Sequence, residues 1–142
     1  MPLGDVVQRA LSLVAPALRG IELRDTVSGT TPIRCAPPLL VQVVTNLVEN
    51  AAHAAGQGGW VEVTSQARDG RVVVEVADSG PGVPTELRER IFEPFFTTKP
   101  PGVGTGLGLA VARDIVNRHG GTLEIRERSD RAVFVIDLPR ST

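Results

Sequence analysis

The sequence predicts an α+β fold, a two-layer α/β sandwich in which helices cover one face of a sheet. Alternating apolar residues mark two pairs of antiparallel strands, and apolar residues at helical spacing mark the helices that accompany them. Elements that are apolar on one side only must pack against each other, which gives two layers. A chain of 142 residues has room for one hydrophobic core, so we expect residues 1–142 to form a single domain.

Two segments have the 3.6-residue period of a helix. In the first, the apolar positions are Val6, Val7, Ala10, Leu11, Val14 and Leu18. Pro16 should end or kink this helix, and a short strand over Ile21–Val27 follows. From Pro37 to Ala55 the spacing predicts the best-defined helix of the chain. Its apolar stripe consists of Leu40, Val44, Leu47, Val48, Ala51 and Ala55.

Two hairpins are indicated by alternation of apolar and polar residues. Trp60–Ala67 and Arg71–Ala77 flank Asp69-Gly70, a dipeptide that favours a tight turn between antiparallel strands. The second hairpin spans Leu123–Leu138, with its turn near Ser129-Asp130.

Between the two hairpins the sequence predicts helices separated by a loop. A short helix is expected over about Pro84–Phe92, and a Gly/Pro-rich loop over Pro94–Gly108. A further helix over about Gly106–His119 should stop at Gly120-Gly121.

Composition and charge narrow the range of partners. Fifteen Lys plus Arg against sixteen Asp plus Glu give a net charge of -1, without the basic excess of a nucleic-acid-binding surface. The single cysteine, Cys35, cannot form a disulfide within the chain, and no signal-like segment opens the sequence, so we expect a cytoplasmic location. The apolar stretches are shorter than the roughly 20 residues that span a bilayer. We expect no nucleic acid and no membrane contact for this chain, and membrane anchoring of a full-length protein stays open.

A polar face lies opposite the apolar stripe of the long predicted helix. Asn46, Asn50 and His53 fall in one narrow sector of the helix, with Gln42 and Glu49 beside them. Carboxamides can bind a hard cation through oxygen or donate to phosphate, so this face suits a metal–nucleotide site. A solvated helix face is the commoner explanation, and spacing alone leaves both open.

Two glycine-containing motifs could bind other parts of a nucleotide. Asp78-Ser79-Gly80-Pro81-Gly82 ends a strand, so its carboxylate could accept from an amino group while the glycines allow close approach. Gly102, Gly104, Gly106 and Gly108 alternate before a helix, where free amides and the helix dipole favour phosphate. An ordinary turn and a flexible helix lead-in remain the alternatives.

Four motifs in one order resemble the N, G1, F and G2 boxes of sensor histidine kinases. They are Asn46-Leu47-Val48-Glu49-Asn50-Ala51, Asp78-Ser79-Gly80-Pro81-Gly82, Ile91-Phe92-Glu93-Pro94-Phe95-Phe96 and Gly104-Thr105-Gly106-Leu107-Gly108-Leu109. The resemblance covers about residues 36–138, and residues 1–35 look like the leading helix and first strands of the family. It implies the catalytic, ATP-binding domain of such a kinase, in the GHKL superfamily, with a Bergerat-type fold and a mixed, mainly antiparallel sheet.

The resemblance implies a role for each matching residue. ATP would lie between the long helix and a lid over about Phe95–Thr105, with Mg2+ bridging the phosphates. Asn50 would coordinate Mg2+, Asn46 would support the metal and phosphates, and His53 would contact phosphate. Asp78 would accept from the adenine amino group in a pocket shaped by Gly80 and Gly82. The lid and the start of the next helix would add Phe95, Thr98, Lys99, Gly104, Thr105, Gly106, Leu107 and Gly108.

The resemblance also implies kinase chemistry instead of rapid hydrolysis. Related GHL ATPases carry a water-activating glutamate where this sequence has Asn46, and an amide cannot act as a general base. Phosphoryl transfer depends chiefly on positioning and charge neutralisation, so a kinase that receives a histidine nucleophile from another domain can do without that base. Glu49 could assist the incoming histidine. Asn46, Glu49 and Asn50 are therefore the candidate catalytic residues.

The chain departs from the family pattern at two points. Cys35-Ala36 replaces an acidic lead-in to the long helix, and neither His53 nor His119 is followed by Glu or Asp as a phosphoacceptor would be. The phosphoacceptor and dimerisation domain would thus be absent, the isolated chain a monomer, and a response regulator an indirect partner. Two alternatives stay open: a nucleotide-responsive binding module without transfer, and a GHL-type ATPase or anti-sigma-type serine kinase.

Overall fold

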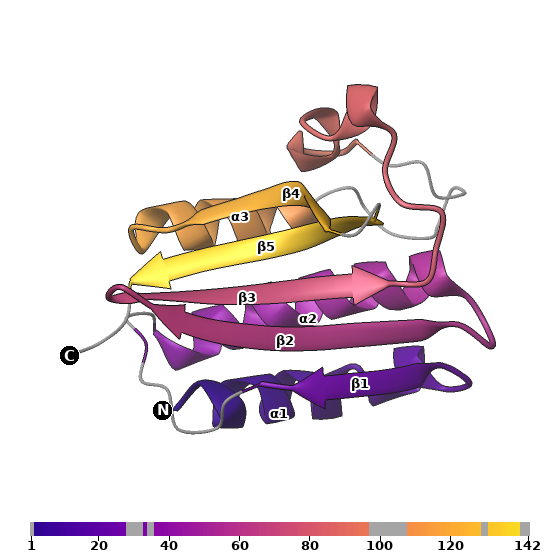
Figure 1. The fold of residues 1–142 in the computed structure, drawn as a ribbon, viewed down its shortest axis with the longest axis horizontal. Coiled ribbons are helices and arrows are strands. Elements are labelled where there is room, and N and C mark those ends of the chain that lie inside the picture. The colour runs from indigo at the N-terminus through magenta and orange to yellow at the C-terminus, as the bar shows by residue number, and fades with distance from the viewer. Residues whose placement is uncertain (1, 28–32, 34–35, 97–107, 129–130, 140–142) are drawn as a thin grey trace.

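A five-stranded sheet organises the computed structural model, which describes residues 2–27, 33, 36–96, 108–128 and 131–139. The strands are β1 (Glu22–Thr26), β2 (Trp60–Arg68), β3 (Arg71–Asp78), β4 (Thr122–Arg128) and β5 (Arg131–Pro139). Their spatial order is β1-β2-β3-β5-β4, with β1 parallel to β2 and every other neighbouring pair antiparallel (Figure 1). The predicted mixed, mainly antiparallel sheet is therefore confirmed.

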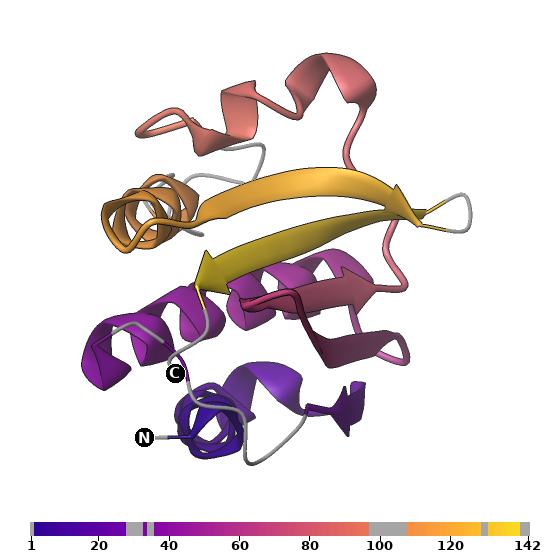
Figure 2. The ribbon, with the colours of Figure 1, turned by 60° about the vertical axis from the view of Figure 1, so that its left-hand side comes forward.

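Three α-helices pack on one face of this sheet. They are α1 (Leu3–Leu13), α2 (Pro37–Ala55) and α3 (Gly108–Arg118), and Figure 2 shows them together on one side of the strands. The other side, which we call the open face, carries none of these helices. The two-layer α/β sandwich is confirmed.

Helix α2 lies at the centre of the core because nearly half of its residues are apolar and buried. Its buried side chains are Leu40, Val41, Val43, Val44, Leu47, Val48, Ala51 and Ala52. The facing strands contribute every second residue, including Val61, Val63, Val72, Val74 and Val76, each at most 1% exposed. Pro37 starts the helix at a position where a missing N–H costs nothing, and Gly56 ends it with a φ of 71°.

Local sequence signals account for two turns in the structure. Asp69 and Gly70 both have positive φ, 51° and 75°, the backbone of the tight turn that matches the twist of a hairpin. The first helix stops at Leu13, and Pro16 lies in a 3-10 turn over Ala15–Leu18, as its position predicts.

The expected short helix over Pro84–Phe92 needs correction. The structure has two separate 3-10 turns, η2 (Thr85–Leu87) and η3 (Arg90–Phe92). Phe92 packs edge-on against Phe134 at 6.3 Å between ring centroids, while the Arg88 guanidinium donates to the Val83 carbonyl. Such tertiary contacts decide the backbone of a segment this short, because an isolated helix of this length is unstable.

The open face of the sheet also buries apolar residues. Val133 and Val135 of β5 are 5% and 1% exposed although they point away from the helices. Ion pairs flank them: Arg126 bonds Glu124 at 3.1 Å, and Arg128 bonds Glu75 at 3.2 Å. In the strand register Glu124 and Glu75 stand opposite Val135, and Arg126 stands opposite Val133. The aliphatic stems of these charged residues therefore shield the valines from water.

Candidate functional site

A small cavity lies between the C-terminal half of α2 and the end of β3. Its lining consists of Asn50, Ala54, Asp78, Gly82, Val83, Ile125, Ala132, Val133 and Phe134. The wall is mostly apolar, with one carboxyl group and one carboxamide. Its volume is about 30 Å3, enough for one or two water molecules.

Asp78 is the acidic group of this cavity. It is the last residue of β3 and pairs with Val61 of β2, on the face that the helices cover. Its Oδ1 accepts a hydrogen bond of 2.7 Å from the Gly80 N–H, and its Oδ2 accepts none from a described residue. Burial raises the pKa of the Asp78 carboxyl, while the Gly80 N–H and the charge of Arg131 act in the opposite direction. One oxygen is thus available to an external donor.

Gly80 and Gly82 are required for different physical reasons. A Cβ on Gly80 would lie 2.5 Å from the Ala54 carbonyl oxygen, so the loop can pass this close to α2 only with glycine. Gly82 has open space around it but a φ of 82°, a conformation that other residues adopt at a cost. The two glycines hold the loop against the cavity and give it its turn.

The polar face of α2 divides into inward and outward parts. Asn50 lines the cavity and Asn46 is half-buried, whereas Glu49 and His53 are exposed. The Asn46 Nδ2 donates a hydrogen bond of 2.9 Å to the Gly108 carbonyl, which ties α2 to the first residue of α3. The structure therefore brings Asn50, Asp78 and Gly82 to one cavity and leaves His53 and Glu49 at the surface of the same helix.

Most of the predicted lid lies outside the described residues. This holds for Thr98, Lys99, Gly104 and Thr105, and also for Gly106 and Leu107, which follow the lid. Phe95, at the near end, is 72% exposed with a φ of 68°. Gly108, which follows the predicted lid, begins α3. The predicted nucleotide contacts of the lid stay predictions.

Several lining residues were missed by the sequence analysis. Ala54 lies one helical turn after Asn50, so the period of α2 alone could have indicated it. Ile125 and Phe134 pair across β4 and β5 on the helix-covered face, which only the strand register shows. Arg131, which lies outside this lining but bonds the Asp78 carbonyl, was missed as well, because that contact spans residues far apart in sequence.

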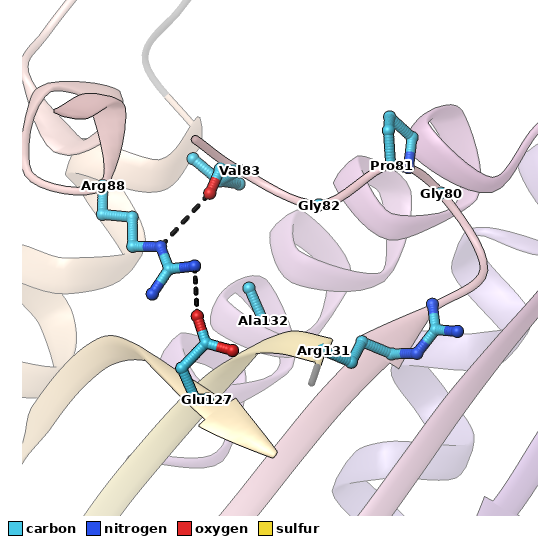
Figure 3. Close-up of a pocket in the computed structure, with 8 residues that line it drawn as sticks. All are labelled: Gly80, Pro81, Gly82, Val83, Arg88, Glu127, Arg131 and Ala132. Carbon is cyan, nitrogen blue, oxygen red and sulfur yellow. Dashed lines mark hydrogen bonds and ion pairs between the residues drawn. The ribbon is translucent and has the colours of Figure 1, made fainter. Parts of the chain in front are cut away.

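A second cavity of about 270 Å3 lies on the other side of the same loop. Its lining consists of Gly80, Pro81, Gly82, Val83, Arg88, Glu127, Arg131 and Ala132 (Figure 3). The figure shows Arg88 turned toward Glu127 and the Val83 carbonyl. The charged groups of this cavity are engaged within the protein, since Arg131 likewise donates to the Asp78 carbonyl.

Metal-binding clusters and membrane-spanning helices were both sought among the described residues. Within the described ranges no three His, Cys, Asp or Glu side chains converge as a metal site would need. A cation held here would depend on the Asn50 carboxamide together with ligand oxygens, a donor set that suits Mg2+. No helix among the described residues combines the length and the apolar character that a membrane crossing needs.

Comparison with known proteins places the chain in a family. Residues 35–142 match the sequence model of the histidine kinase-, DNA gyrase B- and HSP90-like ATPases. The chain is 41% identical over 142 residues to the sensor histidine kinase ZraS of Salmonella typhimurium strain LT2, covering 96% of this chain and 30% of ZraS. This protein therefore spans less than a third of the length of that relative.

Solved structures give the same result. The nucleotide-free catalytic domain of histidine kinase ThkA superposes with a TM-score of 0.88 at 34% identity, covering 99% of this chain and 93% of ThkA's domain. ThkA in complex with the response regulator TrrA superposes with a TM-score of 0.83 at 31% identity, over 99% of this chain and 41% of that one. The chain belongs to the histidine kinase-, DNA gyrase B- and HSP90-like ATPase family. Its sequence and fold are those of the catalytic, ATP-binding domain of a two-component sensor histidine kinase.

Proposed function

We propose that this domain binds ATP with Mg2+ and donates the γ-phosphoryl group to a histidine on a separate dimerisation domain. The cavity between α2 and β3 is the observation that supports this most directly. It sets the Asp78 carboxyl and the Asn50 carboxamide on the wall of one apolar pocket. An acceptor for an amino group at one end and a hard oxygen donor nearby match the two ends of a nucleotide–metal complex.

The described residues suggest how the nucleotide would be held. Asp78 would accept the adenine amino hydrogen at Oδ2, because Oδ1 is already bonded to the Gly80 N–H. The apolar wall formed by Val83, Ile125 and Phe134 would cover the purine ring. Adenine is larger than the cavity, so the wall of the cavity has to open when adenine binds.

The phosphates would lie toward the N-terminal part of α2. Asn50 would contribute its carboxamide oxygen to Mg2+, which supplies neutralisation of phosphate charge when it is bound. Asn46 would support the phosphates and the metal. Its Nδ2 already binds the Gly108 carbonyl, so the same side chain would link the phosphate site to the start of α3. His53 and Lys99 would contact the phosphates, and the backbone amides from Gly104 to Gly108 would hold them. Phe95 and Thr98 of the predicted lid would add to ATP binding.

The site is suited to transfer and poorly suited to hydrolysis. Asn46 stands on the face of α2 where a water-activating carboxylate would be needed, and an amide cannot remove a proton. Glu49 is exposed on the same helix, so a histidine arriving from another domain can reach it. We expect the phosphoacceptor domain to lie outside residues 1–142, the isolated domain to be a cytoplasmic monomer, and a response regulator to receive the phosphoryl group from the acceptor.

Calorimetric titration of the chain with ATP, with and without Mg2+, tests the binding site. Asp78→Asn should weaken binding about tenfold or more, because a carboxamide oxygen accepts the adenine amino hydrogen less strongly than a carboxylate does. Asn50→Ala should remove the dependence on Mg2+. Gln66→Ala, which removes an exposed carboxamide of β2 outside the four motifs, should leave both unchanged. A folded protein that binds no ATP would contradict the proposal.

Single-turnover phosphorylation of an added histidine-bearing dimerisation domain tests the transfer. The acceptor should become labelled from γ-labelled ATP, and Asn50→Ala should prevent the labelling. Saturation with nucleotide without labelling would instead support a nucleotide-responsive binding module. Rapid ATP hydrolysis by the chain alone would support an ATPase.

A further inference from the structure

We propose that Arg131, stacked on Trp60, is a positioning residue that fixes the end of β3 and thereby aims the Asp78 carboxyl at the adenine amino group. The inference rests on the proposed ATP site and adds to it a residue on the opposite face of the sheet. Arg131 is the first residue of β5, and neither its sequence position nor any of the four motifs singles it out.

Arg131 forms a hydrogen bond directly to Asp78. Its Nη1 donates to the Asp78 carbonyl oxygen at 2.6 Å. The backbone register between β3 and β5 ends at Val76 and Phe134, two residues before Asp78. On this side the Arg131 side chain thus holds the part of β3 that the strand pairing no longer reaches.

Trp60 fixes the same strand end from the other side. The Ser79 N–H donates to the Trp60 carbonyl at 3.0 Å, and the Trp60 N–H donates to Ser79 Oγ at 2.9 Å. The end of β3 is therefore bonded on both sides. Trp60 of β2 bonds Ser79, and Arg131 bonds the carbonyl of Asp78. The Arg131 guanidinium carbon lies 4.9 Å from the Trp60 ring centroid, close enough for a cation–π contact that orients the guanidinium.

Arg131 also acts on the carboxyl electrostatically. Burial raises the pKa of Asp78, and the positive charge of Arg131 opposes that rise. The other elements packed around the carboxyl present uncharged groups to it: Asn50 and Ala54 from α2, Ile125 from β4 and Phe134 from β5. His53, the nearby titratable group of α2, is exposed and does not line the cavity. Arg131 is thus the charged partner of Asp78 within the described residues.

The structure provides a matched control in Arg24. Its guanidinium carbon lies 4.6 Å from the same Trp60 ring, but it pairs with Glu22 and makes no contact with Asp78. Removal of Arg24 takes away an arginine on the same tryptophan without touching β3. A difference between the two arginine variants therefore reports on the bond to Asp78 and not on the open face in general.

Affinity for ATP and for ITP, which carries an oxygen in place of the adenine amino group, tests the proposal in the full chain. Arg131→Ala should weaken ATP binding about tenfold, the value of one hydrogen bond to a charged group, and change ITP binding within about twofold. Arg24→Ala should change neither by more than about twofold. Equal losses for ATP and ITP, or equal losses in the two arginine variants, would overturn the proposal.

The pH dependence separates positioning from general damage to the fold. The ionised carboxylate accepts the adenine amino hydrogen more strongly than the protonated carboxyl does, so ATP affinity should fall as the pH drops through the Asp78 pKa. In Arg131→Ala that fall should begin at a higher pH, since the opposing charge is gone. A midpoint that does not move would contradict the electrostatic part of the role.

Arg131→Lys keeps the experiment decisive if the alanine variant does not fold. Lysine retains the charge but lacks the planar fork that both stacks and donates. ATP affinity should therefore fall by less than the tenfold expected for alanine, and the pH midpoint should stay near that of wild type. Wild-type binding that depends on Asp78 but is indifferent to Arg131 would overturn this inference alone. A wild-type chain that binds no ATP would overturn the proposed function, and this inference with it.

Discussion

The two faces of the sheet bury apolar side chains by different means. On the helix-covered face Val74 and Val76 lie beneath α2 and are each 1% exposed. On the open face Val135 is equally buried, also at 1%, but the residues opposite it in neighbouring strands are Glu124 and Glu75. One face is closed by a second layer of the fold, and the other by the stems of charged residues.

The difference shows how the site depends on both faces. The cavity with Asp78 and Asn50 opens at the edge of the helix-covered face, where packing fixes the backbone. The arginine that holds the Asp78 carbonyl belongs to the open face, where ion pairs and cation–π contacts dominate. A mutation on either face can therefore alter nucleotide binding, through lost packing in one case and lost alignment in the other.

The largest loss of stability is expected on the helix-covered face of the sheet. Leu47→Ala removes a fully buried side chain from the middle of α2 and should lower the free energy of unfolding by about 2–5 kcal/mol. Leu39→Ala, on the same helix but 38% exposed, should cost less than about 1 kcal/mol. Urea denaturation of the two variants measures both. Equal losses of stability in the two variants would mean that the buried side chains of α2 do not form the core that stabilises the fold.

A smaller loss of stability, with a large loss of binding, is expected at the edge of this face. Gly80→Ala places a methyl group 2.5 Å from the Ala54 carbonyl oxygen, so backbone must move, at about 1–3 kcal/mol. Gly82→Ala meets open space and should cost only the strain of its φ of 82°, about 1–2 kcal/mol. Thermal unfolding and ATP titration distinguish them: Gly80→Ala should lose binding more completely. The reverse order would mean that turn strain, and not the close approach to α2, shapes the loop.

Sequence reasoning succeeded where the signal is local. The stripe of α2 and the Asp69-Gly70 turn depend on residues within one element, and the structure has both where they were predicted. The segment over Pro84–Phe92 was mispredicted as one helix because its backbone depends on the contact between Phe92 and Phe134, which lie far apart in sequence. No local pattern could show that contact.

The same distinction applies to the site. Asn50, Asp78 and Gly82 belong to recognisable motifs, and the structure brings them to one cavity. Arg131 lies 53 positions from the residue that it holds, and its alternating neighbours mark only an ordinary strand. Burial of Val135 was equally invisible, because alternation assigns it to the exposed face and the residues that cover it come from β3 and β4.

Equivalent valines on the two faces should respond differently to the same change. Val74→Ala and Val135→Ala remove the same atoms from side chains that are each 1% exposed. Under the helices the neighbours are fixed, so Val74→Ala should cost about 1.5–3 kcal/mol. On the open face the stems of Arg128 and Glu75 can settle into the space, so Val135→Ala should cost about 0.5–1.5 kcal/mol. Equal values from denaturant unfolding would mean that the open face is packed as rigidly as the core.

The smallest effect is expected from the ion pairs of the open face themselves. The Arg126 and Glu124 side chains are 40% and 45% exposed, so a double-mutant cycle to alanine should give a coupling of about 0.2–1 kcal/mol that weakens in 1 M salt. Arg126→Ala alone should lower the free energy of unfolding by more than this coupling. The aliphatic stem of Arg126, on the neighbouring strand β4, shields Val133 from water.

The pair of Arg118 and Asp114 on α3 is the control for that last measurement. Its side chains are 76% and 61% exposed, so Arg118→Ala should cost no more than its coupling, about 0.3–0.5 kcal/mol. If Arg126→Ala also costs no more than its coupling, the charged stems do not shield Val133. Arg126→Ala should lose more stability than its coupling energy even in 1 M salt, and Arg118→Ala should not. That result would show that arginine stabilises the open face more by covering apolar surface than by pairing charge.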